Sequence, residues 1–161
     1  MMRFIRLSLA GLLVGFLISG LTIIAISQPV LAVPPHRGGA DLLKQSPTQV
    51  TVRLGNQANG LVFEPNQLSF VAGKRYQLVL TNPSSQKHYF TAKDFADAIW
   101  TQKVEAGNVE IKGVIHELEL KPGAEADWVF VPLKSGTYPL RCTIAGHAEA
   151  GMTGAITVSP G

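Results

Sequence analysis

The sequence predicts an all-β fold, a Greek-key β-sandwich that carries one short crossover helix. Short apolar runs in which inward and outward residues alternate recur along the chain, and turns rich in proline and glycine separate them. The one stretch with a helical pattern, residues 94–99, is too short to be stable alone. We therefore expect it to cross over and pack against the strands.

The expected strands carry apolar residues at alternating positions and are bounded by turn residues. In chain order they cover residues 50–54, 61–63, 68–71, 76–80, 88–91, 100–105, 109–112, 114–120, 125–131, 136–141 and 154–159. Two turns, 72–74 and 121–124, are each predicted to close a hairpin between the strands on either side. The inward faces predict a core of Val50, Val52, Phe70, Tyr76, Leu78, Leu80, Leu118, Leu120, Trp128, Phe130, Leu140 and Ile156.

The N-terminus has the pattern of a secretory signal. Arg3 and Arg6 precede an uncharged run over 7–26, and the small residue Ala32 offers a cleavage site. We expect residues 1–32 to be a signal peptide, with an uncleaved membrane anchor as the alternative, because about 20 apolar residues can span a bilayer. Either interpretation predicts export, to a periplasm or a thylakoid lumen, with any membrane association made by this segment.

Residues 33–47 show no periodicity and are predicted to be a linker in which His36 is solvated, so the domain covers 48–161. Removing Arg3 and Arg6 from the 14 basic residues leaves 12 against 11 acidic ones, a net charge of +1. No basic run is present, which argues against a nucleic acid partner. We expect a monomer.

Three side chains suited to metal binding follow one another near the C-terminus, in the pattern C-x4-H-x4-M. Cys142, His147 and Met152 lie in a loop between two expected strands, so they can turn towards one point. Thiolate, imidazole and thioether ligands select copper, and two histidines with one cysteine and a distant methionine form the blue-copper pattern. The second imidazole would come from His88 or His116. Metal ligation would also explain a single cysteine in an exported chain.

These segments resemble the cupredoxin family of type 1 copper proteins, which includes plastocyanin and azurin. The resemblance rests on residues 136–142, Gly146-His147, residues 151–154 and the region around His88, and the loop spacing is similar to that of auracyanin and rusticyanin. It implies one copper ion with His88, Cys142 and His147 as equatorial ligands and Met152 as the axial one. Many members place asparagine beside the first histidine, where its backbone amide reaches the sulfur. Tyr89 N–H is the candidate for that contact here.

His116 is the rival to His88 as the fourth ligand. It shares the alternating face of Leu118 and Leu120, so we expect an interior histidine bonded to the backbone. His88 is preferred because it follows the strand-ending Asn82-Pro83, as in cupredoxins.

The resemblance implies a one-electron carrier whose copper cycles between Cu(II) and Cu(I), and whose redox partners dock transiently near His147. The alternative is a periplasmic copper chaperone or store without a redox role. An enzyme is not expected, because the chain lacks the His-x-His motifs of multicopper oxidases and the second cysteine of a binuclear copper site.

Overall fold

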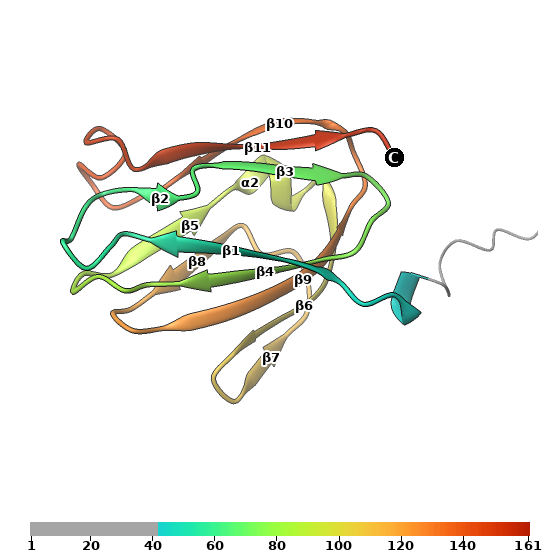
Figure 1. Ribbon diagram of the computed structural model, residues 1–161, viewed down its shortest axis with the longest axis horizontal. Coiled ribbons are helices and arrows are strands. Elements are labelled where there is room, and N and C mark those ends of the chain that lie inside the picture. Colours follow the sequence, from blue (N-terminus) through green and yellow to red (C-terminus); the bar gives the residue numbers. More distant parts are fainter. Residues whose placement is uncertain (1–41) are drawn as a thin grey trace, which may run out of the picture. The chain divides into compact units, whose positions relative to one another are not determined.

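The computed structural model describes residues 42–161, which form a sandwich of two β-sheets (Figure 1). The expected signal peptide 1–32, most of the expected linker and His36 lie outside the described residues. Within 42–161, no helix has both the length and the apolar character that crossing a membrane requires. The all-β fold class is confirmed.

The first sheet has six strands, in the order β2-β1-β4-β9-β6-β7. Its strands are β1 (Thr48–Leu54), β2 (Phe63–Glu64), β4 (Tyr76–Thr81), β6 (Ile99–Ala106), β7 (Val109–Ile111) and β9 (Glu125–Pro132). Strands β1 and β4 are parallel and the other neighbours are antiparallel. Because β1 and β4 are parallel neighbours, the chain between them must leave this sheet, and it does so through β3 (Gln67–Val71).

The second sheet has five strands, in the order β3-β11-β10-β5-β8. Its strands are β3 (Gln67–Val71), β5 (His88–Thr91), β8 (Glu117–Leu120), β10 (Gly136–Arg141) and β11 (Thr153–Ser159). The pairing of β10 with β5 sets Arg141 opposite Thr91. It therefore joins the strand before Cys142 to the strand that begins at His88.

Helix α2 (Lys93–Ala96) connects β5 in one sheet with β6 in the other, which confirms the expected crossover. It begins one residue before the expected 94–99 stretch and ends earlier, because β6 starts at Ile99. A further helical turn covers residues 42–44. The guanidinium of Arg75 donates to the Gln45 carbonyl over 2.6 Å and holds this N-terminal arm against the sheet.

Both hairpin predictions are wrong, although the turns themselves form. Strand β3 pairs with β11 and β4 pairs with β1 and β9, so residues 72–74 carry the chain from one sheet to the other. Residues 121–124 do the same between β8 and β9. Gly73 and Gly123 have positive φ at these turns. Such a turn suits a hairpin and an arch between sheets equally, so the local sequence does not select between them.

The core lies between the sheets and contains ten of the twelve predicted residues as buried side chains, while Val50 and Leu118 are only partly buried. Phe95 of α2 completes an aromatic cluster. Its ring centroid lies 5.4 Å from that of Phe130 and 5.8 Å from those of Phe70 and Tyr138. The helix thus closes the core between the sheets.

We predict that Phe95→Ala destabilises the domain by about 3–5 kcal/mol, because the fully buried ring would leave a cavity among rigid aromatic neighbours. Urea unfolding measures the change. The control is Leu133→Ala, a large apolar side chain that is 60% exposed, for which a change within about 0.5 kcal/mol is expected. A Phe95→Ala change as small as that of the control would show that the cluster does not close the core.

Candidate metal centre

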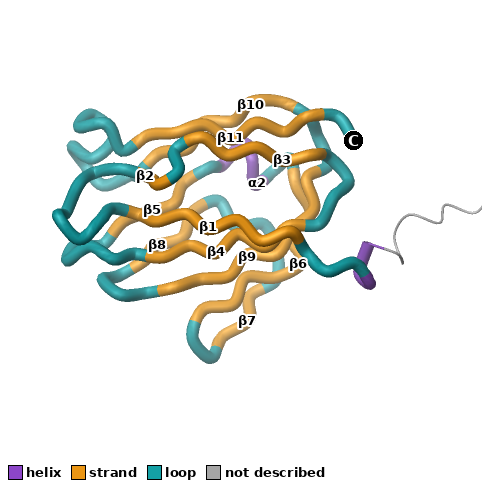
Figure 2. Tube along the Cα trace, in the orientation of Figure 1, coloured by secondary structure: helices purple, strands orange, loops and turns teal. Residues whose placement is uncertain are grey.

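The four predicted ligand residues come from one end of the sandwich, where the β4–β5 loop and the β10–β11 loop meet (Figure 2). His88 is the first residue of β5, and Cys142 directly follows β10. His147 and Met152 lie in the loop between β10 and β11. The pairing of β5 with β10 brings His88 and Cys142 together from distant parts of the chain.

Backbone hydrogen bonds close the β10–β11 loop on itself. Cys142 N–H donates to the Met152 carbonyl over 3.1 Å, and Met152 N–H donates to the His147 carbonyl over 2.9 Å. Gly146 and Gly151 have φ of 84° and 105°, a region that favours glycine. These bonds hold the backbone of all three residues in one closed loop.

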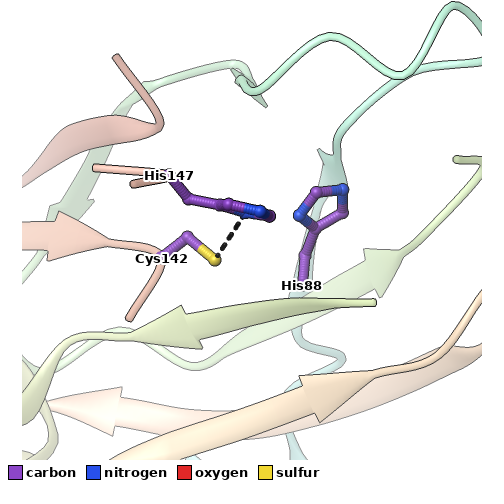
Figure 3. Close-up of side chains that lie close together, drawn as sticks. All are labelled: His88, Cys142 and His147. Carbon is purple, nitrogen blue, oxygen red and sulfur yellow. Dashed lines mark hydrogen bonds between the residues drawn. The ribbon is translucent and has the colours of Figure 1, made fainter. Parts of the chain in front are cut away.

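Three donor atoms converge at this end (Figure 3). One ligand atom each from His88, Cys142 and His147 lies within 4.8 Å of the others. Cys142 Sγ lies 3.5 Å from His147 Nδ1, and the two imidazole centroids are 5.2 Å apart. Since metal–ligand bonds to nitrogen and sulfur are about 2.0–2.3 Å long, one ion fits between donors at this spacing.

The four predicted ligand side chains differ in their exposure to solvent. His88 and Met152 are 0% exposed and Cys142 is 1% exposed, whereas His147 is partly exposed. Among the described residues, His88 Nδ1 is the buried side-chain nitrogen without a hydrogen-bond partner. Burial, and secondarily the charge of His147, lowers the pKa of His88. Both effects favour the neutral imidazole, in which one of the two ring nitrogens keeps a lone pair for a metal.

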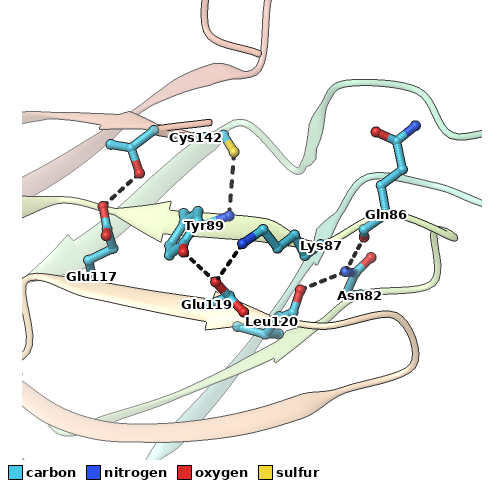
Figure 4. A network of polar contacts seen from close by, with 9 residues as sticks. Asn82, Gln86, Lys87, Tyr89, Glu117, Glu119, Leu120 and Cys142 are labelled. Atoms are coloured by element: carbon cyan, nitrogen blue, oxygen red, sulfur yellow. Dashed lines mark hydrogen bonds and ion pairs between the residues drawn. The ribbon is translucent and has the colours of Figure 1, made fainter. Parts of the chain in front are cut away.

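The predicted contact of Tyr89 with the sulfur is confirmed. Tyr89 N–H donates to Cys142 Sγ over 3.4 Å (Figure 4). The Tyr89 hydroxyl donates to the Glu119 carboxylate, and Lys87 Nζ lies 3.1 Å from the same oxygen. The bond to Glu119 raises the pKa of Tyr89, and the bonds from Tyr89 and Lys87 lower the pKa of Glu119. The network ties β5 to β8 beside the site and fixes the strand that delivers Tyr89 N–H.

A second carboxylate anchors the chain next to Cys142. Glu117 Oε2 accepts hydrogen bonds from Thr143 Oγ1 and Thr91 Oγ1, each over 2.7 Å. These two bonds lower the pKa of Glu117, because they favour its charged form. One side chain of β8 thus holds both β5 and the first residues of the β10–β11 loop.

The prediction of an interior His116 is wrong. Strand β8 begins only at Glu117, so His116 lies outside the alternating pattern and its side chain is 48% exposed. Its Nε2 lies 2.8 Å from Asp97 Oδ1, at the end of α2. Within the described residues it is not part of the donor cluster.

Sequence reasoning did not identify the residues that support the site, among them Ser84, Asn82 and Glu117. Ser84 Oγ lies 3.0 Å from His88 Nε2, and Asn82 lies beside it in the β4–β5 loop. Serine and asparagine at a turn have an ordinary structural explanation, so their residue types carry no signal of this contact.

Comparison with known proteins agrees with the geometry. The family model described as copper-binding proteins of the plastocyanin/azurin family matches residues 50–159, more than half of the chain. No curated protein matches the sequence.

Solved structures with this fold include auracyanin from the photosynthetic bacterium Roseiflexus castenholzii, with a TM-score of 0.52 at 19% identity over 72% of this chain and 100% of that one. Auracyanin B is 28% identical, with a TM-score of 0.49, over 72% and 92% of the two chains. A copper-containing nitrite reductase from Thermus scotoductus SA-01 has a TM-score of 0.55 at 13% identity, over 73% of this chain and 32% of that one. The first and third likenesses show the fold alone.

We predict that Glu117→Gln destabilises the protein at neutral pH, by about 1 kcal/mol because the carboxylate is exposed. A lowered folded-state pKa means that the carboxylate stabilises the fold above its ordinary pKa of 4.5. This stabilisation is lost as the pH falls through the lowered value. The difference between wild type and variant should therefore be smaller at a pH well below 4.5 than at neutral pH.

Urea unfolding of the copper-free protein at both pH values measures this difference. Glu125→Gln serves as the control, since Glu125 is another exposed strand glutamate. A wild-type advantage over Glu117→Gln that stays the same at both pH values would contradict the prediction.

Proposed function

The chain belongs to the plastocyanin/azurin family of copper-binding proteins, and from that premise we propose that it carries single electrons between redox partners. The protein is a blue copper protein with one copper ion as its cofactor. The proposal adds the role: the ion cycles between Cu(II) and Cu(I) while the polypeptide stays in place.

The observation that carries this proposal is the convergence of the buried His88 and Cys142 with the partly exposed His147 around one point. We propose these three residues as equatorial ligands and Met152, from the same loop, as the axial one. Bound copper would supply the one-electron chemistry. Two imidazoles, a thiolate and a distant thioether suit both Cu(II) and Cu(I). The protein supports this chemistry by holding the donors in position and by donating Tyr89 N–H to the sulfur.

His147 is the proposed route for the electron, because it is the partly exposed member of the cluster. Small residues flank it, and Ala145, Gly146, Ala150 and Gly151 are exposed. Such a surface lets a redox partner approach the imidazole edge closely and separate again quickly, since a small contact area binds weakly. We therefore place transient docking at this loop, on a protein that acts as a monomer.

Burial favours electron transfer over copper storage or delivery. His88, Cys142 and Met152 are enclosed by the sandwich, and the loop that carries two of them is closed by its own hydrogen bonds. A chaperone needs donors that a recipient can reach and replace, whereas an electron carrier needs donors that remain in place. Because three of the four proposed ligands are buried, we also propose no enzymatic activity.

We propose that the protein is exported, through the signal-like residues 1–32, to a periplasm or a thylakoid lumen. The single thiol fits this environment if copper occupies it, because a ligated thiolate is protected from oxidation.

We predict that Cys142→Ser abolishes the intense blue or green colour of the Cu(II) protein, because the thiolate is lost. His88→Ala should abolish it as well, and His116→Ala should retain it, since His116 bonds to Asp97 away from the cluster. Absorption and electron spin resonance spectra of the copper-loaded variants test this. A blue Cys142→Ser protein, or a blue His88→Ala protein beside a colourless His116→Ala one, would overturn the assignment.

We predict that Ala145→Glu slows electron self-exchange between two copies of the protein by about tenfold or more, because two like charges would meet in the contact. Line broadening in NMR spectra of mixed Cu(I) and Cu(II) protein measures the rate. Leu133→Glu is the matched control, since it adds the same charge at an exposed position before β10, at the far end of that strand from Cys142. Equal rates for both variants would place the electron's route elsewhere.

A further inference from the structure

The edge of His88 that faces away from Cys142 and His147 is closed by two neighbours. Nε2 lies 3.0 Å from Ser84 Oγ, and both residues are buried. A Cβ atom added to Gly55 would lie 2.7 Å from Nε2 and 3.1 Å from Ser84 Cβ, so the backbone of Gly55 packs against this edge. Ser84 is therefore the side-chain hydrogen-bond partner of Nε2 at this buried edge.

The direction of the Ser84–His88 hydrogen bond follows from the other partners of Ser84. Its Oγ lies 2.8 Å from Asn82 Oδ1 and 2.9 Å from the Gln86 carbonyl oxygen, and both of these atoms only accept. Two oxygens at such a distance repel each other unless a proton lies between them, so these contacts favour placing the single hydroxyl proton on one of the two acceptors. Ser84 Oγ is then left to accept, and the proton between Ser84 and His88 belongs to Nε2.

Asn82 cannot reverse this arrangement by turning its amide over. Its Nδ2 donates to the carbonyls of Gln86 and Leu120 over 2.7 and 2.8 Å, and its Oδ1 accepts from Ser84 N–H over 3.0 Å. Two carbonyls facing the nitrogen and one N–H facing the oxygen determine the amide's orientation. Oδ1 therefore remains the acceptor that faces the Ser84 hydroxyl.

We propose that Ser84 is a positioning residue for His88: its hydroxyl accepts the Nε2–H proton and thereby leaves Nδ1 as the free donor atom that faces Cys142 and His147. This proposal rests on the proposed ligand role of His88. It accounts for the buried Nδ1 that has no hydrogen-bond partner among the described residues. A chain of side-chain bonds from Asn82 through Ser84 selects one imidazole tautomer before any metal arrives.

The direct test is nitrogen NMR of the copper-free protein, which distinguishes a protonated from an unprotonated ring nitrogen. We expect wild-type His88 to carry its proton on Nε2 alone, and Ser84→Ala to show both tautomers. A wild-type proton on Nδ1 would overturn the proposal, whatever the variants do.

Copper release into excess chelator gives a second readout. We expect Ser84→Ala to lose copper about 10–100-fold faster than wild type, with altered absorption and reduction potential. Ser84→Thr, which keeps the hydroxyl, should restore wild-type behaviour. Ser85→Ala is the matched control, because the neighbouring hydroxyl bonds to Asn59 instead of His88, and it should release copper at the wild-type rate.

His88→Ala separates this proposal from the proposed function. A colourless His88→Ala protein together with wild-type tautomer and copper release in Ser84→Ala would overturn the role of Ser84 alone. A blue His88→Ala protein would overturn the ligand role itself. If Ser84→Ala does not fold, two other measurements still test the proposal: the His88 tautomer of the wild-type protein and the copper release of Ser84→Thr. A wild-type proton on Nε2, together with wild-type release by Ser84→Thr, supports the proposal. Any other combination overturns it.

Discussion

The pairing of β5 with β10 is the constraint on which the site depends. The two strands are distant in sequence, and Arg141 opposite Thr91 aligns them. This alignment sets His88, at the start of one strand, near Cys142, just after the end of the other. It also turns Tyr89 N–H towards the sulfur. Glu117, on the neighbouring strand β8, holds both β5 and the start of the β10–β11 loop. Backbone pairing and the Glu117 hydrogen bonds thus contribute directly to the geometry of the site.

Sequence reasoning works where the signal is local. The alternation of apolar residues located nearly every strand, and the four-residue gaps of Cys142, His147 and Met152 located the loop. The hairpin predictions failed because a turn constrains only its own residues, while the choice of sheet depends on partners far along the chain. His116 failed for a related reason: its alternation with Leu118 and Leu120 extends past the start of β8, where the side chain is free to reach Asp97.

Sequence reasoning did not identify the supporting residues, because their roles depend on contacts with side chains that only the fold brings near. Ser84 bonds to His88 only because the turn after β4 returns the chain over the ring, and Gly55, at the end of β1, packs on the same edge. Neither residue type suggests a metal site by itself. The cysteine, histidine and methionine ligands can be recognised from their spacing in the sequence. The contacts that orient these side chains depend on the fold.

Strand β1 sets the distance between the N-terminal arm and the predicted metal site. It starts at Thr48, just after the arm that Arg75 holds, and its seven residues end at Leu54, directly before the glycine that covers His88. At about 3.3 Å per residue, this strand alone separates the two by about 20 Å. The described part of the chain therefore begins at the end of the sandwich opposite the loops that carry the four predicted ligands (Figure 1). The arm held by Arg75 is thus kept clear of those loops.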